Sequence, residues 1–132
     1  MRSCDYPTRT GAELLVDALR IQGVDTIFCV PGESFLSVLD ALRDAKDEIR
    51  LIVCRHEGAA ANMAEAHGKL TGTPGICMVS RGPGATHASI GVHTAKQDST
   101  PMILYLNGAS VLCFDTEFED HGQNSNAGAT SL

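Results

Sequence analysis

Short apolar segments alternate with helical patterns along this chain, and this alternation limits the possible folds more than any other feature. Four runs rich in apolar and β-branched residues are expected to form strands, at residues 26–30, 49–54, 75–80 and 102–106. Helical segments separate them, so each connection needs a right-handed crossover and neighbouring strands run parallel. The sequence therefore predicts an α/β fold, with a doubly wound, mainly parallel sheet covered by helices on both faces.

Four helices are expected before and between these strands, over residues 10–23, 34–42, 57–70 and 85–96. Thr10 and Glu13 have the spacing of a capping box, and Gly23 is a suitable C-terminal stop for the first helix. Ser34 is interpreted as the N-terminal cap of the second helix. The buried stripe of the first helix is expected to consist of Leu14, Leu15, Ala18 and Leu19.

The regular pattern ends near residue 108. Beyond it, Val111–Phe114 could form one more short strand, and the remaining residues show no period. The last 24 residues carry four acidic side chains and no Lys or Arg, within a chain whose net charge is −6. We therefore expect a domain at residues 1–108, followed by an irregular acidic tail at residues 109–132.

Composition and charge exclude several classes of partner. The main body is nearly neutral, and aromatic residues make up only 5% of the chain, so neither a basic patch nor a set of stacking rings is available for nucleic acid. No stretch approaches the ~20 apolar residues that cross a bilayer, and no membrane partner is expected. A small molecule is the class of partner that remains.

The cysteines indicate a reducing compartment. Five occur, without a CxxC pair or metal-like spacing with histidine, so a disulfide framework is not expected. Cys29, Cys54 and Cys77 lie in apolar runs, where cysteine usually serves as a small buried hydrophobe. A cytoplasmic location follows as an expectation.

Glycine, proline and charged residues follow three of the predicted strands. They form the segments Pro31-Gly32-Glu33, Arg55-His56-Glu57 and Arg81-Gly82-Pro83-Gly84. In open parallel sheets, ligands bind at the carboxyl ends of the strands. The three segments are therefore expected to converge on one edge of the sheet and to form a binding site there.

Familiar motifs that these segments resemble are incomplete. Gly82–His87 begins like a dinucleotide-binding turn, but His87 stands in place of the third glycine. His56-Glu57 begins like a zinc-protease helix, but Ala60 replaces the second histidine. Gly32-Glu33-Ser34 begins like a nucleophile elbow, but Leu36 replaces the required glycine. No metal ligands are predicted.

Glu57 is the candidate functional carboxylate. A Glu in the first turn of a helix gains from the helix dipole without any catalytic duty, and its position alone leaves both interpretations open. The small residues Gly58–Ala61 behind it permit a close approach by a planar ligand. A single half-buried acid beside such a ligand is suited to proton exchange with a ring nitrogen.

Four segments together carry a family resemblance. They read Pro31-Gly-Glu-Ser-Phe35, Arg55-His-Glu-Gly-Ala-Ala-Ala-Asn-Met-Ala-Glu-Ala-His-Gly-Lys-Leu-Thr-Gly72, Ser80-Arg-Gly-Pro-Gly-Ala-Thr86 and Ser99-Thr-Pro-Met-Ile103. In this order they resemble the N-terminal pyrimidine-binding domain of acetolactate-synthase-like thiamine diphosphate enzymes. The resemblance spans Thr8 to Gly108.

This resemblance implies a role for each candidate residue. The Glu at the position of Glu57 would hydrogen-bond the ring nitrogen of the cofactor's aminopyrimidine and favour its imino form, which then deprotonates the thiazolium carbon. The cofactor would carry the carbanion chemistry on a 2-keto acid, in a carboligase or a decarboxylase. The remaining cofactor-binding residues would be Pro31, Gly32, Glu33, Ser80, Pro83 and His87.

The chain departs from the family in several places. The family commonly has Asn at the position of His87, and Gly-Gln where this chain has Gly108-Ala109. The Gly-Asp-Gly motif, through which the family anchors the diphosphate and its magnesium in a separate domain, does not occur here. The resemblance therefore implies half of an active site, with self-association or association with a diphosphate-binding domain, and no catalysis by this chain alone.

Three hypotheses about function stay open. The chain could be a fragment or split subunit that becomes active when paired with a diphosphate-binding chain. It could be a non-catalytic remnant of a truncated gene. It could also be an unrelated binding or protein-interaction module on a flavodoxin-like sheet, for which the four motif matches would be coincidence.

Overall fold

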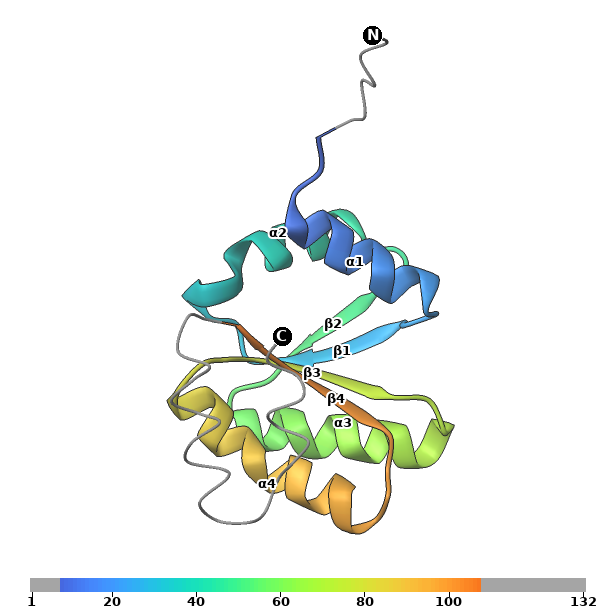
Figure 1. Cartoon of the computed structure of the whole chain (residues 1–132), viewed down its shortest axis with the longest axis vertical. Helices are drawn as coiled ribbons and strands as arrows, with labels where there is room; N and C mark the ends of the chain where they lie inside the picture. Colours follow the sequence, from blue (N-terminus) through green and yellow to red (C-terminus); the bar gives the residue numbers. More distant parts are fainter. Residues whose placement is uncertain (1–7, 108–132) are drawn as a thin grey trace, which may run out of the picture.

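The computed structural model describes residues 8–107 (Figure 1). The helices are α1 (Gly11–Ile21), α2 (Leu36–Asp44), α3 (Glu57–Thr71) and α4 (Pro83–Gln97), with a short 3-10 segment η1 (Glu33–Phe35) before α2. The strands are β1 (Thr26–Cys29), β2 (Arg50–Val53), β3 (Gly75–Ser80) and β4 (Met102–Asn107). Each predicted strand and helix is present, with small shifts at the ends.

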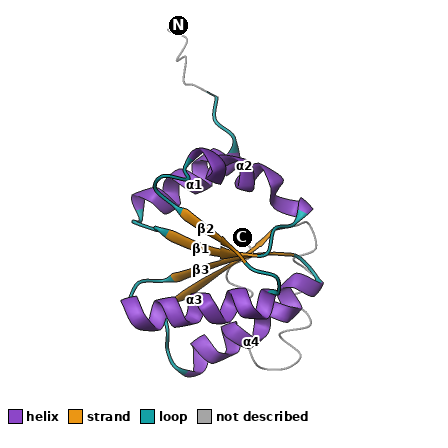
Figure 2. Cartoon of the chain, turned by 180° about the vertical axis from the view of Figure 1, so that it is seen from behind, coloured by secondary structure: helices purple, strands orange, loops and turns teal. Residues whose placement is uncertain are grey.

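The four strands form one parallel sheet in the order β2-β1-β3-β4. Helices α1 and α2 cover one face, and α3 and α4 cover the other, as the views from the front and from behind both show (Figures 1 and 2). The predicted doubly wound α/β fold is confirmed. The order also places β1 between β2 and β3, so the loops that follow these three strands are neighbours.

Helix α1 begins as the sequence predicts but buries only part of the predicted stripe. The Thr10 hydroxyl accepts from the Glu13 N–H at 3.2 Å, and the Glu13 carboxylate accepts from the Thr10 N–H at 2.7 Å. Leu14, however, is 53% exposed, whereas Val16 and Leu19 are buried. Of the predicted stripe, Leu15 packs against the core and Leu19 is buried, whereas Leu14 and Ala18 are exposed. The inward face is thus turned toward Val16.

The assignment of Ser34 as a helix cap was wrong. Residues 33–35 form η1, and α2 begins after Phe35 without a side-chain cap. The Ser34 hydroxyl is buried and has no hydrogen-bond partner among the described residues. Phe35 is only 4% exposed, so the burial of its ring, and not a hydroxyl cap, fixes the entry to α2.

Helix α4 begins two residues before its predicted start. Gly82 has φ +65°, a conformation that glycine adopts readily, and Pro83 then occupies the first turn of the helix. Proline suits this position because the first N–H groups of a helix have no partner within it. Part of the predicted Gly82–Gly84 turn is thus helical.

The sheet has a separate apolar layer on each face. The α1/α2 side is built mainly from large side chains: Val16, Leu19, Ile27, Phe35, Val38, Leu42, Ile49, Ile76 and Met78. The α3/α4 side is built mainly from small ones: Ala60, Ala61, Ala64, Cys77, Val79 and Ala88, together with Phe28. Side chains alternate between the two layers along β1 and β3, as the pleat of a strand requires.

The described cysteines are free thiols, in agreement with the prediction. Cys29 and Cys77 are fully buried, and burial raises the pKa of both thiols to about 12. Cys54 is half-buried, so the predicted burial holds less well there. The first two act as small apolar side chains of the core.

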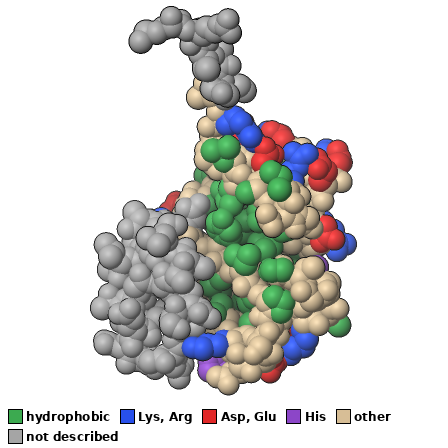
Figure 3. Space-filling model, turned by 45° about the vertical axis from the view of Figure 1, so that its right-hand side comes forward, with side chains coloured by type: hydrophobic (Ala, Val, Ile, Leu, Met, Phe, Trp, Pro, Cys, Tyr) green, Lys and Arg blue, Asp and Glu red, His purple; other side chains and the backbone are tan. Residues whose placement is uncertain are grey.

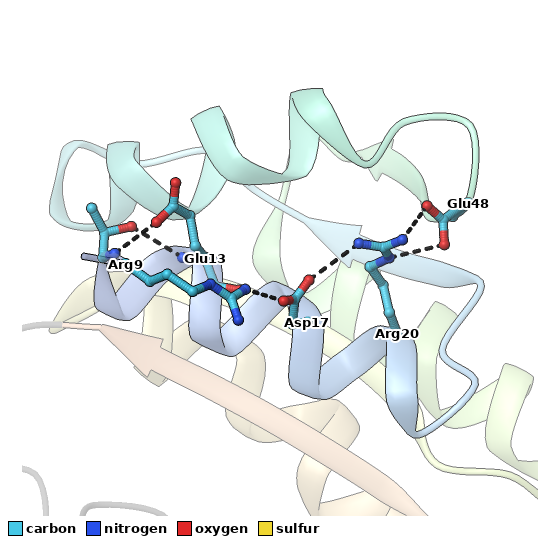
Figure 4. A network of polar contacts seen from close by, with 6 residues as sticks. Arg9, Glu13, Asp17, Arg20 and Glu48 are labelled. Atoms are coloured by element: carbon cyan, nitrogen blue, oxygen red, sulfur yellow. Dashed lines mark hydrogen bonds and ion pairs between the residues drawn. The ribbon is translucent and has the colours of Figure 1, made fainter. Parts of the chain in front are cut away.

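Charged side chains gather over the α1/α2 layer (Figure 3). Figure 4 shows the network in which Asp17 pairs with Arg9 and Arg20, and Arg20 also binds Glu48 through two hydrogen bonds at 2.9 and 2.5 Å. The hydrogen bond from Arg9 lowers the pKa of Asp17. These pairs are exposed, so they contribute little to stability, but they tie α1 to the loop that precedes β2.

Two further expectations concern the ends of the chain and membranes. The possible strand at Val111–Phe114 and the tail at residues 109–132 lie outside the described residues. Within residues 8–107, no helix is long and apolar enough to span a bilayer.

Candidate functional site

The loops after β1, β2 and β3 lie at one edge of the sheet, where the candidate residues are found. The backbone N–H of Val30 donates to the Met78 carbonyl at 3.1 Å, and the Cys54 N–H donates to the Cys29 carbonyl at 2.7 Å. These bonds continue the sheet pairing into the loops. The predicted convergence of the three segments is therefore a property of the fold.

Glu57 is the first residue of α3, and its carboxylate reaches across to α4. Its side chain is 17% exposed, and its Oε2 lies 3.0 Å from Nδ1 of His87, in the second turn of α4. The carboxylate thus stands in the first turn of a helix, in the favourable field of the N-terminus. It is partly shielded from water yet accessible from the edge.

Two histidines surround this carboxylate. The Nδ1 of His56 accepts from the Gly58 N–H at 3.0 Å and so caps α3. The rings of His56 and His87 stack, with their centroids 5.0 Å apart and their planes 24° from parallel. The stack connects the start of α3 to α4.

The walls of the site are built from close backbone approaches. A Cβ atom on Gly84 would lie 2.8 Å from the Ser80 hydroxyl and 3.5 Å from Oε1 of Glu57. A Cβ atom on Gly32 would lie 2.9 Å from Cβ of Ser80. Gly32, Ser80, Gly84 and Glu57 therefore form a contiguous surface in which two backbone segments lack side chains.

The environment favours the ionised form of Glu57. Burial raises the pKa of its carboxyl, but the hydrogen bonds from its own backbone N–H and from His87, and the positive charge that His87 and His56 can carry, outweigh burial. The net result is a pKa below the ordinary value of 4.5. The group is thus a hydrogen-bond acceptor at neutral pH.

The same three side chains have the composition of a transition-metal site, but their hydrogen bonds oppose it. One ligand atom each from His56, Glu57 and His87 lies within 4.8 Å of the others. Because Nδ1 of His56 accepts from Gly58, a neutral His56 carries its proton on Nε2, the nitrogen that a metal would need.

The remaining predicted residues lie on the same edge, with less defined roles. Pro31, Glu33 and Pro83 are exposed. The sequence interpretation missed the part played by His56, which was considered only as half of a zinc motif. The available signal was its position, directly after a strand and before Glu57, which is the usual place for a capping side chain.

Comparison with known proteins shows the family to which the chain belongs. The family described as thiamine pyrophosphate enzyme, N-terminal TPP binding domain, matches residues 9–124. This chain belongs to that family of thiamine pyrophosphate enzyme domains. The match includes all the segments that carried the sequence resemblance, and it extends beyond Gly108.

Individual relatives of this TPP-binding domain are much longer proteins. The chain is 46% identical over 99 residues to the acetolactate synthase large subunit of Parasynechococcus marenigrum, covering 74% of this chain and 16% of the relative. It is 48% identical over 93 residues to the acetolactate synthase of Bacillus subtilis, covering 70% and 16%. The pyruvate oxidase of Lactiplantibacillus plantarum is 37% identical over 112 residues, covering 83% and 18%. The chain thus spans about a sixth of the length of these relatives.

Proposed function

We propose that this chain binds the aminopyrimidine ring of thiamine diphosphate at the carboxyl edge of its sheet, with Glu57 as the acid that faces the ring nitrogen. One observation carries the proposal above the others. The ionised carboxylate of Glu57 projects from the end of α3 onto the surface formed by Gly32, Ser80 and Gly84. A flat ring with a basic nitrogen fits an acceptor beside side-chain-free backbone.

The described residues fit this cofactor. Glycine at residues 32 and 84 lets both backbone segments pack directly against Ser80, which leaves peptide groups and not side chains next to the Glu57 carboxylate. Pro31, Gly32 and Glu33 would border it from the β1 loop, and Ser80, Pro83 and His87 from the β3 loop and α4. Bound thiamine diphosphate supplies carbanion chemistry at its thiazolium ring.

The chain's own contribution is to bind, orient and share one proton. With the cofactor bound, the ionised carboxylate of Glu57 would accept a hydrogen bond from the protonated ring nitrogen, and this would favour the imino form of the aminopyrimidine. Its position within a partly shielded edge strengthens that hydrogen bond relative to water. The diphosphate and its magnesium would be held by a separate domain, as the resemblance to the family implies.

The chain would then supply the pyrimidine-binding half of an active site in an acetolactate-synthase-like carboligase or a 2-keto acid decarboxylase. The relatives that it matches are much longer proteins, of which the matched part covers 16%, and this supports an arrangement in which further domains complete the site. Self-association or pairing with a diphosphate-binding domain is part of the proposal. The alternative is a domain of this fold that has lost cofactor binding and serves protein interactions.

Calorimetric titration with thiamine diphosphate and magnesium tests the proposal. The chain is expected to bind the cofactor, and Glu57→Gln is expected to weaken binding by about tenfold, because an amide cannot share the proton with the ring nitrogen. Glu48→Gln, an exposed acid on the opposite side of the sheet, is the matched control and should bind as the unmodified chain does. No saturable heat at millimolar cofactor would favour the alternative function.

A further inference from the structure

A short series of contacts ends on one of the two oxygens of Glu57. The Gly58 N–H fixes the ring of His56, this ring stacks on His87, and Nδ1 of His87 meets Oε2 of Glu57 at 3.0 Å. The other oxygen, Oε1, is the one that lies beside Gly84. The contacts therefore distinguish the two oxygens of the carboxylate.

The direction of each hydrogen bond follows from its partners. A backbone N–H can only donate, so Nδ1 of His56 accepts, and a neutral His56 carries its proton on Nε2. An ionised carboxylate can only accept, so Nδ1 of His87 carries a proton and donates to Glu57. The two histidines are thus held in opposite tautomers.

Close backbone packing keeps the arrangement in place. A Cβ atom on Gly58 would lie 3.2 Å from the His87 carbonyl oxygen and 3.1 Å from the ring of His56. The first turn of α3 therefore touches the backbone of α4 directly. His87 is 51% exposed at its outer side, so its ring is held mainly by Glu57 and by the stack on His56.

We propose that His87 is a positioning residue: by donating from Nδ1 to Oε2, it orients the Glu57 carboxylate so that Oε1 faces the Ser80–Gly84 surface where the aminopyrimidine binds. The identity of the ligand in this inference rests on the proposed function. The tautomers of the two histidines do not, because they follow from the hydrogen bonds. His87 acts through Glu57 and need not touch the reacting atoms. The ring of His56 stacks on the ring of His87 and helps to hold it in place.

Nitrogen-15 NMR of the histidine side chains in the full chain without cofactor tests the arrangement alone. His87 is expected in the Nδ1–H form and His56 in the Nε2–H form. In Glu57→Ala, His87 should move to the Nε2–H form that a solvated imidazole favours, while His56 keeps its own. Finding His87 in the Nε2–H form in the unmodified chain would overturn the inference, whatever the chain binds.

Thiamine diphosphate titrations of position 87 variants test the consequence for binding. His87→Ala is expected to weaken binding about fivefold, in line with a half-exposed pair. His87→Asn should bind within about twofold of the unmodified chain, because its amide N–H stands near the position of Nδ1 and can still donate. His93→Ala removes another exposed histidine of α4 and is the matched control.

Each outcome of these titrations decides a different question. Equal affinity of His87→Ala and the unmodified chain, or equal loss in Ala and Asn variants, would overturn the positioning role. Absence of binding by the unmodified chain contradicts the proposed function, and the NMR experiment then judges the hydrogen-bond arrangement separately. The same NMR signals can be followed during a titration with zinc. Loss of the assigned tautomer signals of both His56 and His87 at micromolar zinc would show that the two rings act as metal ligands, and would also overturn the inference.

Discussion

The two faces of the sheet are packed with different kinds of side chain. Beneath α1 and α2, large residues such as Leu42 and Ile76 interdigitate. Beneath α3 and α4, alanine and glycine bring backbones together: a Cβ atom on Gly91 would lie 2.6 Å from the Ala61 backbone carbon, and one on Gly75 only 1.8 Å from the Ala64 carbonyl oxygen. The first face provides most of the apolar burial, and the second sets the spacing of the helices that carry the site.

This difference explains why Glu57 and His87 meet. They stand on α3 and α4, and the close contact of these helices at Gly91 allows a carboxylate and an imidazole to bridge them. Large side chains between the helices would hold them further apart. Stability and site geometry should therefore respond differently to changes on the two faces.

A cavity on the α1/α2 face should have the largest effect on stability. Leu42 is 2% exposed, and Leu42→Ala is expected to lower the free energy of unfolding by about 3 kcal/mol, measured by urea denaturation. The contact between Glu57 and His87, which joins α3 to α4 on the other face, should keep its geometry, so the NMR signals of His87 should not change under folding conditions. A shift of those signals would break the distinction between the faces.

An added methyl group on the α3/α4 face should affect both properties. Gly91→Ala is expected to lower the free energy of unfolding by about 2 kcal/mol, because the backbone of Ala61 occupies the space. It should also separate α3 from α4 and weaken the bond from His87 to Glu57, seen as a change of the His87 tautomer. Gly11→Ala is the control, since nothing lies within 4 Å of a Cβ there, and it should be neutral or slightly stabilising.

Thiol labelling compares how the two faces open. Cys29 lies in the α1/α2 layer and Cys77 in the α3/α4 layer, and burial raises the pKa of both thiols to about 12. At about pH 8, each should therefore react with iodoacetamide only after opening of the fold, and much more slowly than the half-buried Cys54. Mass spectrometry measures the rate of labelling at each cysteine. If Cys77 is labelled faster than Cys29, the α3/α4 layer opens while the α1/α2 layer stays closed.

The smallest expected effect is the pH dependence contributed by Glu57. Its pKa is lowered in the folded chain, so the folded state binds fewer protons than the unfolded state near the ordinary value of 4.5. Its contribution to stability is present above that value and is lost as the pH falls through the lowered pKa. Relative to Glu57→Gln, the unmodified chain should gain less than about 1 kcal/mol at pH 7 and lose this gain in acid. An advantage that grows in acid would contradict the assigned hydrogen bond between His87 and Glu57.

Much of the fold could be predicted from local patterns. The alternation of apolar runs and helix signals gave the parallel α/β architecture, and the capping box at Thr10 marked the start of α1. Ser34 misled because a hydroxyl near a helix start is a common cap, whereas here the burial of Phe35 decides the local conformation. The stripe of α1 was right at Leu15 and Leu19 but wrong at Leu14, because apolar residues occur on both sides of Val16 and the pattern alone does not show which of them face the core.

The candidate site could be predicted only in outline. The positions of the loops after three strands follow from the rule for parallel sheets, and this rule predicted that Glu57 lies at the carboxyl edge, where the structure has it. The contacts of His56 with His87 could not be read from local sequence, because they depend on how closely α3 and α4 pack. That distance is set by glycines such as Gly91, whose role becomes visible only when the facing backbone is known.

The most direct test of the account is a map of backbone amide shifts during titration of the full chain with thiamine diphosphate. The account predicts saturable changes at residues 31–33, 57–58 and 80–87, which line the carboxyl edge, and none around Leu42 or α1. Saturable changes confined to the opposite edge or to the α1/α2 face would contradict it, as would the absence of any change at millimolar cofactor.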